Sequence, residues 1–91
     1  MSIKTYELFV GSNKKTGNLE TDKLIEVTLE HFEEATISAS LIELRRDGQE
    51  KGLSVIVKAD LKTLDKYIRR LKKVLNLDEV IYHQINKFKN S

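Results

Sequence analysis

The segment with the most chemical potential is 11–17 (GSNKKTG), which combines glycines, lysines and hydroxyl groups. Loops of this kind between a strand and a helix can bind phosphate through backbone N–H groups. The P-loop pattern G-x-x-x-x-G-K-[ST] is not matched, because both lysines precede the second glycine and Asn-Leu follows it. A solvated connecting loop is the simpler interpretation, and we keep Asn13, Lys14 and Lys15 as candidate ligands of a small anion.

A second candidate is the basic segment 61–75. Helical spacing places Lys66, Arg69, Arg70 and Lys73 on one side, where they can contact phosphates. We include Arg69, Arg70 and Lys73 in the anion site. The alternative function is nucleic-acid binding through this face with Lys87 and Lys89. A plain solvated face that pairs with an acidic neighbouring helix is the simplest interpretation, and each exposed pair contributes about 0–1 kcal/mol.

Histidine chemistry has little support. His31 and His83 are the only histidines, they lie on distant predicted elements, and the chain has no cysteine. No Ser-His-Asp, Cys-His or metal-ligand spacing is recognisable. We therefore expect no catalytic residues, no metal site and no cofactor, and a small enzyme using His83 or His31 is the weakest of the alternatives.

Length and composition bound the rest. The 91 residues predict a single domain over 1–91 with a small core, which self-association can supplement. The absence of cysteine and of any long apolar run predicts a cytoplasmic protein that does not enter the membrane. Residues 1–44 carry a net charge of −4 and residues 45–91 one of +6, an asymmetry that bears on partners.

The elements that position these groups follow from periodicity. β-forming residues predict a strand over 5–10. Thr21 is the expected N-cap of a helix over 22–35. The apolar face of that helix consists of Leu24, Ile25, Thr28, Leu29 and Phe32. Two further strands are expected over 36–45 and 52–59, joined by 46–51. Asp47-Gly48 favours a hairpin turn, which is either these two residues alone or a longer loop that reaches Gly52.

The second half continues the alternation. Asp60 is the expected N-cap of a helix over 61–75 that ends at Asn76. Its apolar stripe consists of Leu61, Leu64, Ile68, Leu71 and Leu75. A last strand over 80–85 precedes a frayed tail, 86–91. The order β-α-β-β-α-β predicts an α+β, ferredoxin-like fold with a four-stranded antiparallel sheet and two helices on one face.

One face of this sheet is left open. If Leu8 and Val10 face the helices, Phe9 faces away, and Ile56 does the same on the third strand. In the last strand either Tyr82 or Ile81 joins them. An apolar patch on a small polar domain usually marks an interface, so Phe9, Ile56 and Tyr82 are the expected contact residues of a homodimer or higher oligomer, joined through the sheets or edge to edge.

Three segments carry a resemblance. The stretches 6–11 (YELFVG) with Asn13, 50–57 (EKGLSVIV) and 75–81 (LNLDEVI) are similar to a family of small stand-alone bacterial or phage domains of uncharacterised function. The resemblance implies a ferredoxin-like fold and no particular activity, because this fold supports many functions.

The leading functional hypothesis is a non-enzymatic, homo-oligomeric binding module for a small anionic ligand or a protein partner. One version is a phage or plasmid accessory protein that sequesters a nucleotide signal or inhibits a host factor. Nucleic-acid binding is the alternative.

Overall fold

The computed structural model describes the backbone of residues 2–45 and 48–85 and the side chains of residues 2–38 and 52–85. The predicted turn at Asp47 and the predicted tail 86–91 therefore lie wholly or partly outside the described residues.

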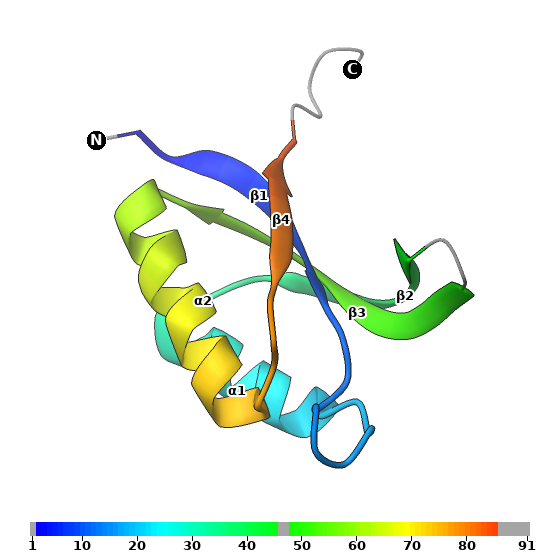
Figure 1. Cartoon of the computed structure of the whole chain (residues 1–91). Coiled ribbons are helices and arrows are strands. Elements are labelled where there is room, and N and C mark those ends of the chain that lie inside the picture. Colours follow the sequence, from blue (N-terminus) through cyan, green and yellow to red (C-terminus); the bar gives the residue numbers. More distant parts are fainter. Residues whose placement is uncertain (1, 46–47, 86–91) are drawn as a thin grey trace.

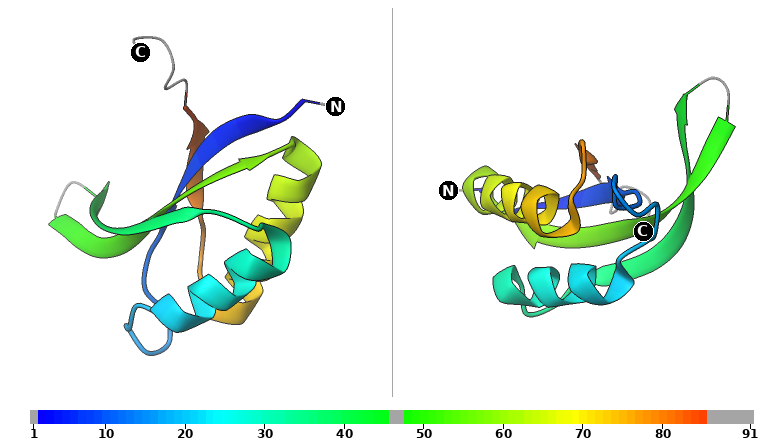
Figure 2. Two further views of the ribbon diagram at one scale, coloured as in Figure 1. Left: turned by 180° about the vertical axis from the view of Figure 1, so that it is seen from behind. Right: turned by 60° about the horizontal axis from the view of Figure 1, so that its bottom comes forward.

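The fold prediction is confirmed. The elements are β1 (Lys4–Val10), α1 (Thr21–His31), β2 (Thr36–Arg45), β3 (Gly48–Ala59), α2 (Leu61–Leu75) and β4 (Ile81–Gln84). They build an antiparallel four-stranded sheet in the order β2-β3-β1-β4 (Figure 1). Both helices lie on the same side of the sheet, as the view from behind in Figure 2 shows. This is the ferredoxin-like arrangement, and within residues 2–45 and 48–85 no helix covers the opposite face of the sheet.

The core forms where the two central strands face the helices. Tyr6, Leu8 and Val10 of β1 lie directly opposite apolar residues of β3, in the pairs Tyr6↔Val57, Leu8↔Val55 and Val10↔Leu53, and all six side chains are buried. Alternate residues of a strand point to opposite faces, so this register places Glu7 and Phe9 on the open face, as predicted.

Helix α2 begins and ends as predicted. The Oδ1 atom of Asp60 accepts a hydrogen bond from the backbone N–H of Thr63 at 2.7 Å, and Asn76 ends the helix in the left-handed region with φ 56°. The buried stripe is Leu64, Tyr67, Leu71 and Leu75. The prediction that Leu61 belongs to the stripe is wrong, since this side chain in the first turn is 63% exposed. Tyr67 instead fills the space between the helices.

Helix α1 differs most from its prediction. It ends at His31 instead of residue 35, because Phe32 adopts an extended conformation (φ −138°, ψ 144°) that packs its ring against Tyr67. Thr21 is the first helical residue and not the N-cap; Glu20 occupies that position without a side-chain cap hydrogen bond. The buried side chains are Leu24, Val27 and Thr28, whereas Ile25 and Leu29 of the predicted apolar face are exposed.

The β2–β3 hairpin is longer than predicted. Strand β3 begins at Gly48, four residues before the predicted start at Gly52, and Gly48 pairs with Arg45. The pairing of β3 with β1 stops at Leu53, so residues 48–52 pair with β2 alone. The hairpin accordingly projects beyond the rest of the sheet (Figures 1 and 2). At the other edge, β4 covers 81–84 of the predicted 80–85.

Within residues 2–45 and 48–85, neither helix has the length and apolar character that a membrane crossing requires.

Candidate functional site

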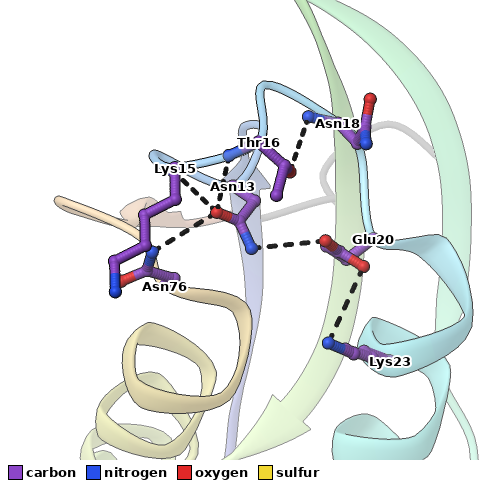
Figure 3. A network of polar contacts seen from close by, with 7 residues as sticks. All are labelled: Asn13, Lys15, Thr16, Asn18, Glu20, Lys23 and Asn76. Atoms are coloured by element: carbon purple, nitrogen blue, oxygen red, sulfur yellow. Dashed lines mark hydrogen bonds and ion pairs between the residues drawn. The ribbon is translucent and has the colours of Figure 1, made fainter.

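The loop after β1 is organised around the buried side chain of Asn13 (Figure 3). Its Oδ1 atom accepts hydrogen bonds from the backbone N–H groups of Lys15 (2.8 Å) and Thr16 (3.2 Å) and from the side-chain amide of Asn76 (3.3 Å). Its Nδ2 atom donates to Oε2 of Glu20 at 3.2 Å. Asn13 thus fastens the loop both to itself and to the two helices.

The backbone N–H groups that could bind a phosphate in this loop already donate to Asn13. The N–H groups of Lys15 and Thr16 point at Asn13, and Gly17, with φ 76°, donates its N–H to the carbonyl of Asn13 at 2.8 Å. A phosphate-binding loop presents such N–H groups to its ligand instead. Asn13 therefore has a structural role. The groups of this loop that can contact an anion are the exposed side chains of Lys14 and Lys15.

The two lysines of the loop are exposed. Lys14 donates its backbone N–H to the carbonyl of Asn76 at 3.0 Å, and its Nζ atom lies 2.7 Å from a carboxylate oxygen of Asp78. This ion pair is open to solvent on both sides, so it contributes little and an anion can displace it at small cost. The structure thus brings the predicted residues Asn13, Lys14 and Lys15 to the C-terminal end of α2, where Lys73 occupies the last turn.

The two arginines of the predicted anion site are engaged elsewhere. Arg69 pairs with Asp65 one turn earlier at 3.0 Å, and Arg70 reaches across to Glu30 of α1 at 3.3 Å. The Arg70–Glu30 pair is the contact between basic and acidic helices that the charge asymmetry predicts. In the structure this contact directs Arg70 toward α1.

The open face of the sheet is built from two rows of residues that run across the strands. One row is Ile56, Glu7 and His83, and the other is Ser54, Phe9 and Ile81. Phe9 and Ile56 are half-buried and Ile81 is 40% exposed. Of the two alternatives for β4, the register selects Ile81.

Tyr82, the third expected contact residue, lies on the other face. It stands directly opposite Leu8 and makes an edge-to-face contact with Tyr6, with ring centroids 6.0 Å apart. As part of edge strand β4 it is nevertheless 45% exposed. Tyr82 is therefore accessible at the sheet edge and not on the open face.

Glu7 is the polar centre of the open face. Its Oε2 atom accepts a hydrogen bond from the hydroxyl of Ser54 at 2.8 Å, and its Oε1 atom lies 3.0 Å from Nε2 of His83. The imidazole of His83 is stacked on Phe9, with an angle of 10° between the rings. The sequence shows that Glu7 faces outward, but only the β1–β4 register brings His83 beside it.

A buried polar contact joins the two helices. The hydroxyl of Thr28 donates to the carbonyl of Leu24 at 2.6 Å and lies 2.7 Å from the hydroxyl of Tyr67. Because the one proton of Thr28 goes to Leu24, Tyr67 is the donor in the second bond. Burial raises the pKa of Tyr67 to about 12. This contact stabilises the helix pair, and it engages the hydroxyl groups of both Thr28 and Tyr67.

His31 and a shallow hollow lie at the C-terminal end of α1. The Nδ1 atom of His31 lies 3.0 Å from the carbonyl of Val27. The hollow has a volume of about 450 Å³, and its lining includes His31, Glu33, Glu34 and Lys58. Across the described part of the chain, no three histidine, aspartate or glutamate side chains gather in a metal-binding arrangement.

Comparisons with known proteins support the fold. No model of a known protein family matches the chain, and no curated protein is similar to it in sequence. Among solved structures, a DUF3240 family protein from Shewanella baltica superposes with a TM-score of 0.65 over 100% of this chain and 97% of its own, at 12% identity. At this identity the likeness concerns the fold alone, and it is in keeping with the resemblance to a small uncharacterised domain.

Proposed function

We propose that this protein is a non-enzymatic binding module that acts as a homo-oligomer, with the open sheet face as its subunit contact. The observation that carries the proposal is the pair of Phe9 and Ile81, which are direct cross-strand neighbours, with Ile56 of β3 in the next row, diagonally opposite Phe9. These apolar side chains occupy the one sheet face that neither helix covers.

The polar groups at the centre of this face are hydrogen-bonded to one another. Both carboxylate oxygens of Glu7 have a hydrogen-bond partner, in Ser54 and His83. Polar groups that are already paired cost much less to remove from water than unpaired ones. A second copy is the occupant we favour, since burying a further apolar surface supplements the small core of a chain of 91 residues.

The absence of enzymatic activity is part of the proposal. The hydroxyl of Ser54 donates its hydrogen bond to Glu7 and not to a histidine, so these residues do not form the relay of a Ser-His-Asp triad. His31 contacts a backbone carbonyl, and His83 contacts Glu7. His83 thus belongs to the hydrogen-bonded group of Glu7 on the open face, whereas His31 lies apart from it on α1.

The ligand we propose is a small anion bound by the exposed lysines at the C-terminal end of α2. Lys14 and Lys15 extend from a loop whose backbone Asn13 and Asn76 hold in place, and Lys73 stands in the neighbouring helical turn. Because the loop backbone is already ordered, only the lysine side chains lose conformational freedom when an anion binds. A nucleic acid is the alternative ligand, and it would use the basic face of α2, where Arg69 and Arg70 make exposed ion pairs that a phosphate can displace as easily as that of Lys14.

Sedimentation velocity over a wide range of protein concentration tests the proposed assembly. The expected result is a concentration-dependent shift from monomer to oligomer. Replacing Phe9 by serine should move this shift to higher concentration. A monomer throughout the range, for the unmodified chain, contradicts the proposal.

A further inference from the structure

The Glu7–His83 pair lies inside the surface that the proposed function assigns to subunit contact. Glu7 stands directly opposite His83 in the β1–β4 register, and the atoms Oε1 and Nε2 are 3.0 Å apart. The side chain of His83 is 53% exposed and that of Glu7 is 25% exposed, so water still reaches both in the single chain. A second copy on this face would remove that water.

The charge of the pair depends on one proton. With a neutral imidazole, the group of Ser54, Glu7 and His83 carries the single negative charge of the carboxylate. With a protonated imidazole, the group is a neutral ion pair. Burying a net charge costs far more than burying a hydrogen-bonded pair of opposite charges, and two copies brought face to face would also place two such carboxylates on one interface.

The other groups around the pair do not compensate this charge. Strand β3 contributes the uncharged Ser54, and β2 contributes Thr36 and Ser38 to the same face. Lys58 is the remaining charged side chain on this face among those described; it lies in the row of Thr5, one row beyond the row of Glu7. Both helices lie on the opposite side of the sheet.

We infer that association of the subunits is coupled to uptake of a proton by the Glu7–His83 pair, so that copies of this chain bind one another more tightly at pH 6 than at pH 8. The inference rests on the proposed function, because it requires the open face to be the contact. Imidazole is the group whose charge changes in this range of pH. Each linked proton changes the association constant about tenfold per pH unit.

The test is the association constant of the full chain, measured by sedimentation equilibrium between pH 8 and pH 6. The constant should rise about tenfold or more for the unmodified protein. His83→Gln should remove the dependence, whereas His31→Gln, on the helical side of the molecule, should keep it. Circular dichroism at both pH values verifies that each variant is folded.

Glu7→Gln separates a charge effect from a structural one. Glutamine keeps an oxygen for Ser54 and removes the negative charge, so this variant should associate more tightly than the unmodified chain at pH 8 and should lose or reverse the pH dependence. Weaker association of Glu7→Gln at pH 8, or an unmodified chain with the same constant at both pH values, overturns the inference and leaves the proposed function standing. A monomer at every pH overturns both.

Discussion

The side-chain amide of Asn76 donates a hydrogen bond to Oδ1 of Asn13, 63 residues away, and so joins the first loop to the end of α2 (Figure 3). Asn76 is in the left-handed conformation that ends the helix, which directs its amide toward the loop. One residue therefore both terminates α2 and positions the segment that carries Lys14 and Lys15.

The hydrogen bonds of Asn13 predict that replacing its side-chain amide lowers the stability of the fold. Asn13→Asp keeps the acceptor oxygen and loses the donor to Glu20, so that two carboxylates face one another at hydrogen-bond distance. We expect the free energy of unfolding to fall by roughly 1–3 kcal/mol, the cost of breaking a buried hydrogen bond of this kind. Chemical denaturation measures it. Asn18→Asp, at an exposed position of the same loop, is the matched control and should cost well under half as much.

The contact between the helices predicts a loss of stability in alkali. The pKa of Tyr67 is about 12 in the folded chain against 10.0 for the ordinary group, so the folded state holds the phenol proton more tightly. Its contribution is fully present below pH 10 and is lost as the pH rises toward 12, by up to roughly 3 kcal/mol. The denaturation midpoint of Tyr67→Phe should depend less on pH over this range.

The stability of Tyr67→Phe at neutral pH and the control variant Tyr82→Phe serve to interpret the alkaline measurement. At neutral pH Tyr67→Phe should cost about 1 kcal/mol, because the hydroxyl oxygen of Thr28 loses its donor while its own bond to Leu24 stays. Tyr82→Phe, at a side chain that is 45% exposed, should keep the pH dependence of the unmodified chain. Identical alkaline profiles for Tyr67→Phe and the unmodified chain would show that Tyr67 does not carry the effect.

The N-cap of α2 predicts a smaller loss of stability in acid. The hydrogen bond from the backbone N–H of Thr63 lowers the pKa of Asp60 below 3.8. Its stabilising effect is present above pH 3.8 and disappears as the pH falls through the lower, folded-state pKa. Asp60→Asn keeps a capping oxygen, and its melting temperature should depend less on pH in the acid range than that of the unmodified chain. Asp60→Ala should lower the melting temperature at neutral pH. Asp22→Ala, in the first turn of α1, is the control for charge.

The proposed ligand predicts a thermal shift that depends on the loop. A panel of inorganic phosphate, nucleotides and small carboxylates should contain at least one member that raises the melting temperature. Lys14→Ala combined with Lys15→Ala should abolish the shift, while Lys62→Ala combined with Lys66→Ala, also on exposed residues, should keep it. A panel without any shift for the unmodified chain contradicts the anionic ligand.

Much of the fold follows from local patterns. Asp60, Asn76 and the alternation in β1 identify their elements because each acts over a few residues. The end of α1 could not be predicted in the same way, since no glycine or proline marks it; the packing of Phe32 on Tyr67 ends the helix. The candidate site, too, could be predicted only in part. The outward direction of Phe9 is a matter of alternation, whereas the choice of Ile81 over Tyr82 and the contact of Glu7 with His83 depend on a register between strands that are distant in sequence.

Light scattering on chromatographically separated variants tests the proposed assembly most directly. Ile81 and Ile25 are both 40% exposed, on the open sheet face and on α1 respectively, and Tyr82 lies next to Ile81 on the opposite face. We predict that the unmodified chain and Ile25→Asp have the mass of an oligomer and that Ile81→Asp has the mass of a monomer. Tyr82→Asp should remain an oligomer, because Tyr82 is not on the open face. If Tyr82→Asp is monomeric and Ile81→Asp is not, the contact runs through the edge of β4 instead. A monomeric mass for the unmodified chain, or an oligomeric mass for Ile81→Asp at all concentrations, would contradict the account.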